Sequence, residues 1–392
     1  MVKPLQGPNW VLLSLILLGV VAWLWLPVIS LAPNRIVPGT PYTAFAVSEG
    51  KLFLALTSML TMLMLGVAWL AWRATRKETW LALGTVGVLL ALLPLWLAAA
   101  AAELVEPDQP QARITLGAAF WLLWFVLLLA LIELRTRLRL SRPMGWLLLL
   151  PMMAGWGLAL WLWLEPLALL REYQARSEQF ADALIIHLAL VGAAVAASLI
   201  LAIVGVLAMR RCSGLQRPGF AVLNFLQTIP SLALFGLLLA PLAWLGSQVE
   251  WLGALGVSGI GWAPAFLALL GYSLLPMVRN LHVALDAVDP AVIEAARGMG
   301  MSRRQVLLQA RLPLALPVVV EGLRITTIQA IGLTAVAALI GAGGLGTFIF
   351  QGLGQAAMDM VLLGALPIIV LALVTDALFG TLSEWLRPGG EL

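Results

Sequence analysis

The chain has 392 residues, of which 62% are apolar and 11% are charged, against roughly 45–50% and about 25% in ordinary soluble domains. A water-soluble core of this length could not bury so much apolar surface without exposing large patches, so the composition excludes a soluble protein. One cysteine, Cys212, excludes an intramolecular disulfide, and the two histidines, His187 and His282, are too few for a Cys/His metal cluster.

Ten apolar stretches are long enough to cross a membrane, because a spanning helix needs about 20 mostly apolar residues. They cover residues 10–31, 52–72, 80–102, 114–132, 145–164, 183–209, 220–245, 259–278, 314–340 and 358–382. Pro230 and Pro241 interrupt the seventh stretch, and Pro264 and Pro276 interrupt the eighth. The predicted fold class is an all-α, polytopic membrane protein with about ten transmembrane helices.

The basic residues test this topology independently of hydropathy. With a cytoplasmic N-terminus, the inside segments carry 17 of the 23 Lys and Arg and the outside segments carry five, while Arg324 lies in the ninth span. This asymmetry follows the positive-inside rule and predicts a multi-pass protein with both termini in the cytoplasm. A cleaved signal peptide is the alternative for the first stretch, but residues 10–31 exceed the apolar region of about 7–15 residues in such peptides.

The two halves of the chain differ in character. Thirteen of the 17 Trp precede residue 164, whereas the Gly and Pro of the second half cluster within and between its spans. Residues 171–182 are the most polar stretch of their length and suit an extracytoplasmic surface helix or linker. We therefore expect a Trp-rich region of about five helices at 1–170 and five further helices at 183–385. Trp anchors helices at membrane interfaces, and an aromatic cage for a quaternary ammonium ligand is the alternative.

The longest polar insertion of the second half, residues 286–313, is expected on the cytoplasmic side. Asp289 is a good N-cap residue and Pro290 suits the first helical position. The sequence therefore predicts a helix at 290–297 that ends at Gly298 and Gly300.

A second short helix is predicted in the same insertion. Ser302 and Gln305 form a capping-box pair, which opens a helix that runs to about Arg311 and ends before Pro313. A helix-turn-helix with arginines can bind DNA. About 28 residues between two membrane spans leave no compact module to enter a groove, however, so no nucleic-acid partner is expected.

This insertion carries the signature of a family. Small side chains at Ala295, Ala296 and Gly300 would let another protein approach the backbone, and Glu294 offers a carboxylate. The run Glu294-Ala295-Ala296, Gly300 and Ala310-Arg311-Leu312-Pro313 resembles the EAA loop (E-A-A-x3-G-x9-I-x-L-P) of permease subunits in binding-protein-dependent ABC importers, with alanine at position 310 in place of isoleucine. Residues 224–238, 322–327 and 338–350 are similar to permeases of glycine betaine, choline and related osmoprotectant importers.

The resemblance covers about residues 181–382, and the additional N-terminal helices are similar to the long permease of the Yeh-type betaine system. It implies an ABC importer permease core at 183–385, in the bacterial inner (cytoplasmic) membrane and without a catalytic site. A cytoplasmic ABC ATPase would bind ATP and Mg²⁺, a second permease subunit (the same or a different chain) would complete the pathway, and an extracytoplasmic binding protein would deliver the solute. The ATPase would contact Glu294, Ala295, Ala296, Gly300, Leu312 and Pro313. The chain has no Walker A sequence, so no cofactor of its own is expected.

Charged residues inside a membrane need partners or an aqueous path. Glu321 and Arg324 lie three positions apart, on one helical face of the ninth span. The pair is either a structural contact or a gate that lines the pathway. Asp376, near the end of the tenth span, is expected at the interface.

One turn of the seventh span combines polar side chains with a helix break. It contains Gln227, Thr228, Pro230 and Ser231. Membrane interiors tolerate such breaks where a cavity is lined or where helices pack together. The turn is therefore a candidate for the pathway, and a packing kink is the equal alternative.

Four glycines follow the ninth span: Gly341, Gly343, Gly344 and Gly346. Three of them spell G-x-G-x-x-G, but a dinucleotide site needs a preceding strand and a βαβ frame, which this position lacks. We expect a tight re-entrant turn on the outer side.

The predicted function is a permease subunit of an ATP-driven importer for glycine betaine or a related osmoprotectant. An ion-coupled secondary carrier or channel is the alternative, although it would need buried acids along several spans and only Glu321 approaches this. A membrane enzyme would need a carboxylate or His cluster at one membrane face, which the sequence does not contain. The solute, the pairing of permeases and the role of the N-terminal helices stay open.

Overall fold

The computed structural model describes residues 7–35, 37–106, 108–109, 111–162 and 164–386. The chain separates into two compact units, Met1–Ala175 and Arg176–Leu392. Within the described residues, nine helices are long and apolar enough to span a membrane, and Trp10–Trp25 is a shorter apolar helix. The helical, polytopic architecture expected from hydropathy is therefore confirmed.

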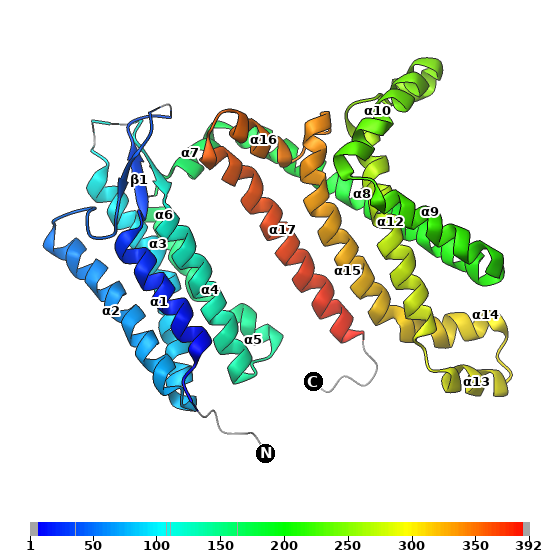
Figure 1. Cartoon of the computed structure of the whole chain (residues 1–392), viewed down its shortest axis with the longest axis horizontal. Helices are drawn as coiled ribbons and strands as arrows, with labels where there is room; N and C mark the ends of the chain where they lie inside the picture. The colour runs from blue at the N-terminus through cyan, green and yellow to red at the C-terminus, as the bar shows by residue number, and fades with distance from the viewer. Residues whose placement is uncertain (1–6, 36, 107, 110, 163, 387–392) are drawn as a thin grey trace. The chain divides into compact units, whose positions relative to one another are not determined.

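The first unit combines helices with a small sheet (Figure 1). Its helices are α1 (Trp10–Trp25), α2 (Lys51–Arg73), α3 (Arg76–Leu104), α4 (Ala118–Leu138), α5 (Arg142–Leu147), α6 (Leu150–Leu162) and α7 (Ala168–Ala175). Its strands are β1 (Ile29–Ala32), β2 (Thr40–Tyr42) and β3 (Arg113–Leu116), in the antiparallel order β2-β1-β3.

The sheet corrects two predicted spans. The first was expected to reach residue 31, but α1 ends at Trp25 and Pro27 follows, which cannot continue a helix. The fourth was expected from residue 114, but α4 begins at Ala118. The end of the first predicted span and the start of the fourth are the strands β1 and β3, which pair with each other. In this pairing Ile29 and Ile114 are buried in the core.

The core of the first unit is built around buried tryptophans. The rings of Trp23 and Trp96 are 0% exposed and meet edge to face with centroids 4.9 Å apart. Trp96 Nε1 donates to Thr57 Oγ1 at 2.9 Å, and Trp23 Nε1 donates to Thr61 Oγ1 at 3.1 Å. Because the two rings are in direct contact, they form part of a packed core, and no ligand fits between them as in an aromatic cage.

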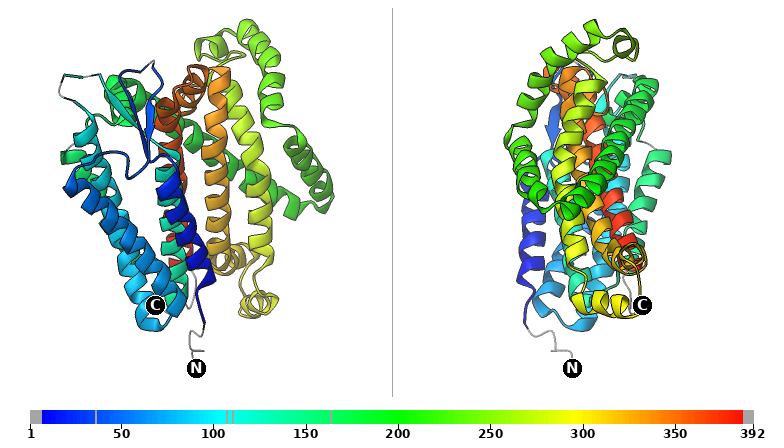
Figure 2. Two further views of the ribbon diagram at one scale, coloured as in Figure 1. Left: turned by 60° about the vertical axis from the view of Figure 1, so that its left-hand side comes forward. Right: turned by 90° about the vertical axis from the view of Figure 1, so that its right-hand side faces the viewer.

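The second unit consists of long helices and short connecting ones. They are α8 (Ser177–Arg211), η1 (Ser213–Leu215), α9 (Gln216–Thr228), α10 (Ser231–Gln248), α11 (Glu250–Ala254), α12 (Trp262–Asp286), α13 (Pro290–Gly298), α14 (Arg303–Gln305), η2 (Val306–Arg311), α15 (Leu312–Ala337), η3 (Ala338–Ile340), α16 (Gly346–Gly354) and α17 (Met358–Trp385). Helices α12, α15 and α17 lie side by side, with α8 against α12 (Figure 2).

The structure confirms the helical alternative in one predicted segment and corrects the seventh span. The polar stretch 171–182 belongs to α7 and α8, which are separated at Arg176, and the boundary between the units falls there. The seventh span, expected at 220–245, is two helices, because the chain is extended at Ile229 and Pro230 between α9 and α10.

Candidate functional site

The predicted EAA-type loop begins as the sequence indicates. Asp289 caps α13, with its Oδ1 atom accepting a hydrogen bond from the backbone N–H of Ala291 at 2.8 Å. The helix ends at Gly298, and Gly300 has φ +82°, a left-handed conformation that favours glycine. The predicted helix at 290–297 and its end at the glycines are confirmed.

The second half of the loop starts as predicted but does not end as predicted. Ser302 Oγ accepts from the Gln305 N–H at 3.4 Å, and Gln305 Oε1 accepts from the Ser302 N–H at 2.9 Å, which completes the capping box. The helix was expected to end before Pro313, but it continues through the π-helical segment η2 into α15. In an α-helix a proline ring clashes with the carbonyl four residues earlier. The π-helical turn before Pro313 is wider, which moves that carbonyl away from the ring and lets the helix continue.

The loop is attached firmly to α15. Ile293 and Ala296 of α13 are buried with Val306 of η2 in one apolar cluster, and α13 contacts η2 directly. A packed contact and a continuous helix therefore connect α13 to α15.

The predicted contact residues divide by exposure. Glu294, Ala295, Gly300, Leu312 and Pro313 are exposed. Ala296 is only 3% exposed, so the expectation that it faces a partner is not met. Its methyl group instead holds α13 against η2, because positions 293 and 296 share the inner face of the helix.

A polar network missed in the sequence lies at the same end of the unit. Asp286 at the end of α12 accepts from Arg210 Nη1 at 2.7 Å and lies 3.4 Å from His282 Nε2. The amide Nε2 of Gln216 is 3.0 Å from His282 Nε2. These contacts join the ends of α8, α9 and α12 next to the loop.

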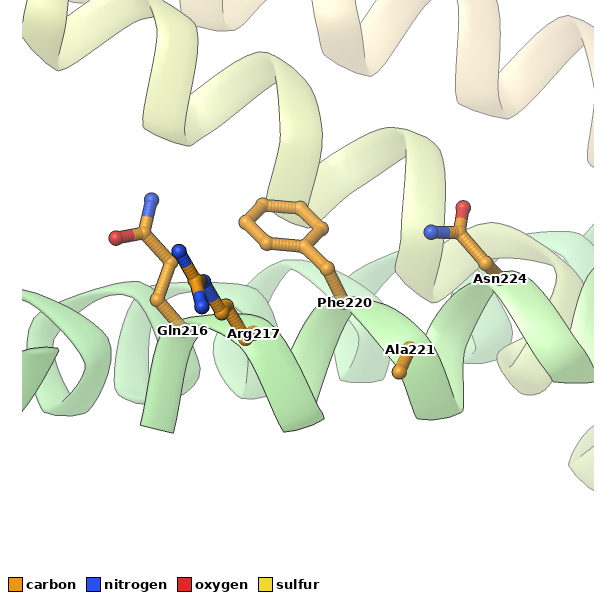
Figure 3. A pocket seen from close by; sticks show the side chains of 5 residues that line it. All are labelled: Gln216, Arg217, Phe220, Ala221 and Asn224. Carbon is orange, nitrogen blue, oxygen red and sulfur yellow. The ribbon is translucent and has the colours of Figure 1, made fainter. Parts of the chain in front are cut away.

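Helix α9 carries a surface groove of about 550 Å³ beside this network. Figure 3 shows Gln216, Phe220 and Asn224 extending from one side of the helix, and the remaining lining residues are Arg217 and Ala221. The Phe220 and His282 rings meet edge to face with centroids 5.7 Å apart. Gln216, Phe220 and Asn224 are four residues apart in the sequence, which places them on one face of a helix, and this spacing could have predicted the face.

The intramembrane charges form a group of three. Arg324 Nη1 donates to Glu321 Oε1 at 2.8 Å, and Arg324 Nε donates to Asp376 Oδ1 at 2.8 Å. Asp376, which we expected at the interface, therefore joins α17 to α15 through Arg324, a contact that the sequence did not indicate. The carboxylate side chains of Glu321 and Asp376 remain 42% and 47% exposed, whereas that of Arg324 is 23% exposed.

The break between α9 and α10 is held by bonds to α12. Gln227 Nε2 donates to the Tyr272 carbonyl at 2.9 Å, and the Tyr272 hydroxyl donates to the Ile229 carbonyl that the break releases. Thr228 Oγ1 donates to the Phe225 carbonyl at 2.7 Å. Pro230 precedes α10, and Ser231 is its first residue. These contacts support the packing kink, and Tyr272 is the member of the site that sequence reasoning missed.

The predicted glycine turn is present between η3 and α16. Gly341, Gly343 and Gly344 have φ values of +76°, +78° and +82°. A Cβ at Gly346 would lie 1.9 Å from the Ala335 carbonyl oxygen, so this position admits no side chain without movement of the backbone.

The glycine turn packs on a buried histidine of α8. His187 is 0% exposed, and its Nε2 is 3.1 Å from the Ile331 carbonyl oxygen. A Cβ at Gly344 would lie 3.3 Å from His187 Nδ1. Within the described part of the chain, no three His, Cys, Asp or Glu side chains come together as a possible metal site.

Comparisons with known proteins cover both units. The family described as the N-terminal domain of the ABC transporter permease YehY matches residues 7–170. The family described as the inner membrane component of binding-protein-dependent transport systems matches residues 194–388.

Individual relatives are similar to about half of the chain. The osmoprotectant import permease protein OsmW of Salmonella typhimurium is 42% identical over 205 residues, which are 52% of this chain and 90% of the relative. The glycine betaine/carnitine/choline transport system permease protein OpuCD of Bacillus subtilis is 37% identical over 180 residues, which are 46% of this chain and 70% of the relative. A solved inward-facing MetNI methionine ABC transporter matches with a TM-score of 0.48 and 20% identity, over 55% of this chain and 99% of that one.

Proposed function

Because the chain belongs to the family of inner membrane components of binding-protein-dependent transport systems, we propose that it imports glycine betaine or a related osmoprotectant with energy from a separate ATPase. The substrate class is supported by the names of the relatives, which import osmoprotectants, glycine betaine, carnitine and choline. The protein would lie in the bacterial inner membrane with both termini in the cytoplasm, as the distribution of Lys and Arg favours.

The observation that carries this proposal is the capped loop at 286–313 and its fusion to α15. ATP binding can drive a permease only by binding its two conformations unequally, and a shift from 1:99 to 99:1 needs about 5.5 kcal/mol. A flexible loop would absorb such a difference locally. The buried contact of Ile293 with Val306 and the unbroken helix through η2 would instead deliver it to α15, which carries Glu321 and Arg324.

In this proposal the exposed residues Glu294, Ala295 and Gly300 contact the ATPase, and Ala296 supports them from inside. ATP and Mg²⁺ bind to the ATPase, so this chain has no catalytic residue. A second permease subunit completes the pathway, and an extracytoplasmic binding protein selects the solute. The group of Glu321, Arg324 and Asp376 is our candidate for the pathway wall, since its carboxylates stay half exposed although both bond to Arg324, and charged groups within a membrane face water-filled paths or protein.

The test is uptake of labelled glycine betaine by proteoliposomes that contain the chain with its ATPase and binding protein. Gly300→Asp should abolish uptake, because a carboxylate would obstruct the docking surface where no side chain now stands. Gly7→Asp is the matched control, since it adds the same group at another open glycine with a positive φ outside the loop. Undiminished uptake by Gly300→Asp, or uptake that an ion gradient drives without ATP, would contradict the proposal.

A further inference from the structure

An apolar groove of about 410 Å³ opens between α3, α4 and the segment α5–α6 of the first unit. Small residues of α3 form one side of it, including Gly84, Gly87 and Ala91, and Leu131 and Pro151 stand opposite. A Cβ at Gly84 or Gly87 would meet no described atom within 4 Å. The space above these glycines is therefore not filled by the unit's own described side chains.

One end of this groove is cationic. Arg135 lies one turn beyond Leu131 on α4, and its guanidinium lies against the backbone of Gly145, where an added Cβ would be 2.8 Å from Arg135 Cζ. Lys77 lies three residues before Trp80, another lining residue, at the start of α3. Both cations therefore stand at the same end, next to an apolar space.

The acidic side chains at this end have other partners. Glu78 accepts from the Thr75 backbone N–H at 2.9 Å, and Glu133 accepts from Arg137 Nε at 3.0 Å. Among the described residues, no ion pair involves Arg135 or Lys77. Arg135 and Lys77 are therefore available to an anion from outside the unit.

We propose that the groove binds one acyl chain of an anionic phospholipid, with the headgroup phosphate at Arg135 and Lys77. The occupant must be amphipathic, because the groove is apolar and its end is basic. Basic pockets between helices at the membrane surface bind anionic headgroups, and a hydrocarbon chain replaces the missing side chains above Gly84 and Gly87. The site would bind phosphatidylglycerol in preference to the zwitterionic phosphatidylcholine.

Native mass spectrometry of the delipidated full-length protein, titrated with phosphatidylglycerol or phosphatidylcholine, tests this site. Gly87→Leu should remove the bound lipid of both kinds, because the new side chain fills the groove. Arg135→Gln should weaken the binding affinity for phosphatidylglycerol about fivefold and leave the affinity for phosphatidylcholine unchanged. The matched controls are Gly66→Leu, at an open glycine of α2, and Arg76→Gln, an exposed charge at the start of α3.

A phosphatidylglycerol with a diazirine in mid-chain gives an independent measurement that does not depend on any variant. It should label peptides that contain residues 84–91 and 147–151. Gly84→Leu replaces Gly87→Leu if the latter elutes as an aggregate. Equal lipid retention by the Gly87 and Gly66 variants would overturn the proposal. So would a photoreactive residue at position 84 that captures a protein helix, because the groove would then be a protein interface.

Discussion

The two units differ in the partners and the exposure of their polar side chains. In the first unit, 61% of the most apolar window of α3 is buried, and the indole N–H groups of Trp23 and Trp96 are bonded to hydroxyls within the core. In the second unit, α17 carries the half-exposed Asp376, which bonds to Arg324 of α15. The first unit bonds these two indoles within its core, whereas in the second unit the carboxylates of Glu321 and Asp376 bond to Arg324 and remain half exposed.

From this difference we propose that the second unit lines the pathway and that the first unit supports it. An exposed carboxylate in contact with hydrocarbon costs about 2.5–3.5 kcal/mol on insertion scales. The faces of α15 and α17 that carry Glu321 and Asp376 therefore suit an aqueous pathway or a polar partner. The following experiments, from the largest expected effect to the smallest, would break or sharpen this contrast.

The largest effect is expected at Arg324. Arg324→Leu leaves Glu321 and Asp376 as two like charges without their shared cation, and uptake of glycine betaine should be lost. The exchange Arg324→Asp with Asp376→Arg, made together with Glu321→Gln so that no second carboxylate lies beside position 324, keeps an ion pair between α15 and α17. It should restore uptake, measured in the same proteoliposomes and compared with Glu321→Gln alone, if the contact between α15 and α17 is what matters. Failure of the exchange with normal insertion would mean that one of the side chains acts on the solute directly.

A large loss of stability, rather than of coupling, is expected in the first unit. Trp96→Ala removes a fully buried ring and should lower the free energy of unfolding by about 3–5 kcal/mol. Thermal unfolding in detergent measures this, with Trp25→Ala as control because Trp25 is 71% exposed. If uptake per folded molecule also fell in Trp96→Ala, the first unit would take part in transport and the contrast between the units would fail.

A smaller loss is expected at the glycine turn. Gly346→Ala places a methyl group 1.9 Å from the Ala335 carbonyl oxygen and should cost about 1–3 kcal/mol of stability. Gly332→Ala, on α15, meets open space and should not destabilise the protein. Equal unfolding temperatures for the two variants would show that the turn yields without cost.

Local features of this fold could be predicted from the sequence, and contacts between distant segments could not. The caps at Asp289 and Ser302 depend on residues within three positions, so the sequence alone could predict them. The pairing of Ile29 with Leu116 and the bond from Arg324 to Asp376 join segments far apart in the chain. Hydropathy could not distinguish these strands from the adjoining apolar helices, and it gave no partner for Asp376. The role of the EAA-type loop stays a prediction.

The smallest effect offers the most direct comparison, because the described residues of each unit include a capping box. Thr75 and Glu78 form it at the start of α3, and Ser302 and Gln305 form it in the coupling loop. Replacement of either cap by alanine should cost about 1 kcal/mol of local helix stability, seen as faster hydrogen exchange of the first turn.

Uptake should separate the two variants. Ser302→Ala loosens the start of the helix that leads into α15, so uptake should fall severalfold at unchanged ATPase abundance. Thr75→Ala loosens a helix of the supporting unit to the same extent and should leave uptake unchanged. Equal uptake by both variants would show that rigidity at the start of this helix is not what couples the loop to α15.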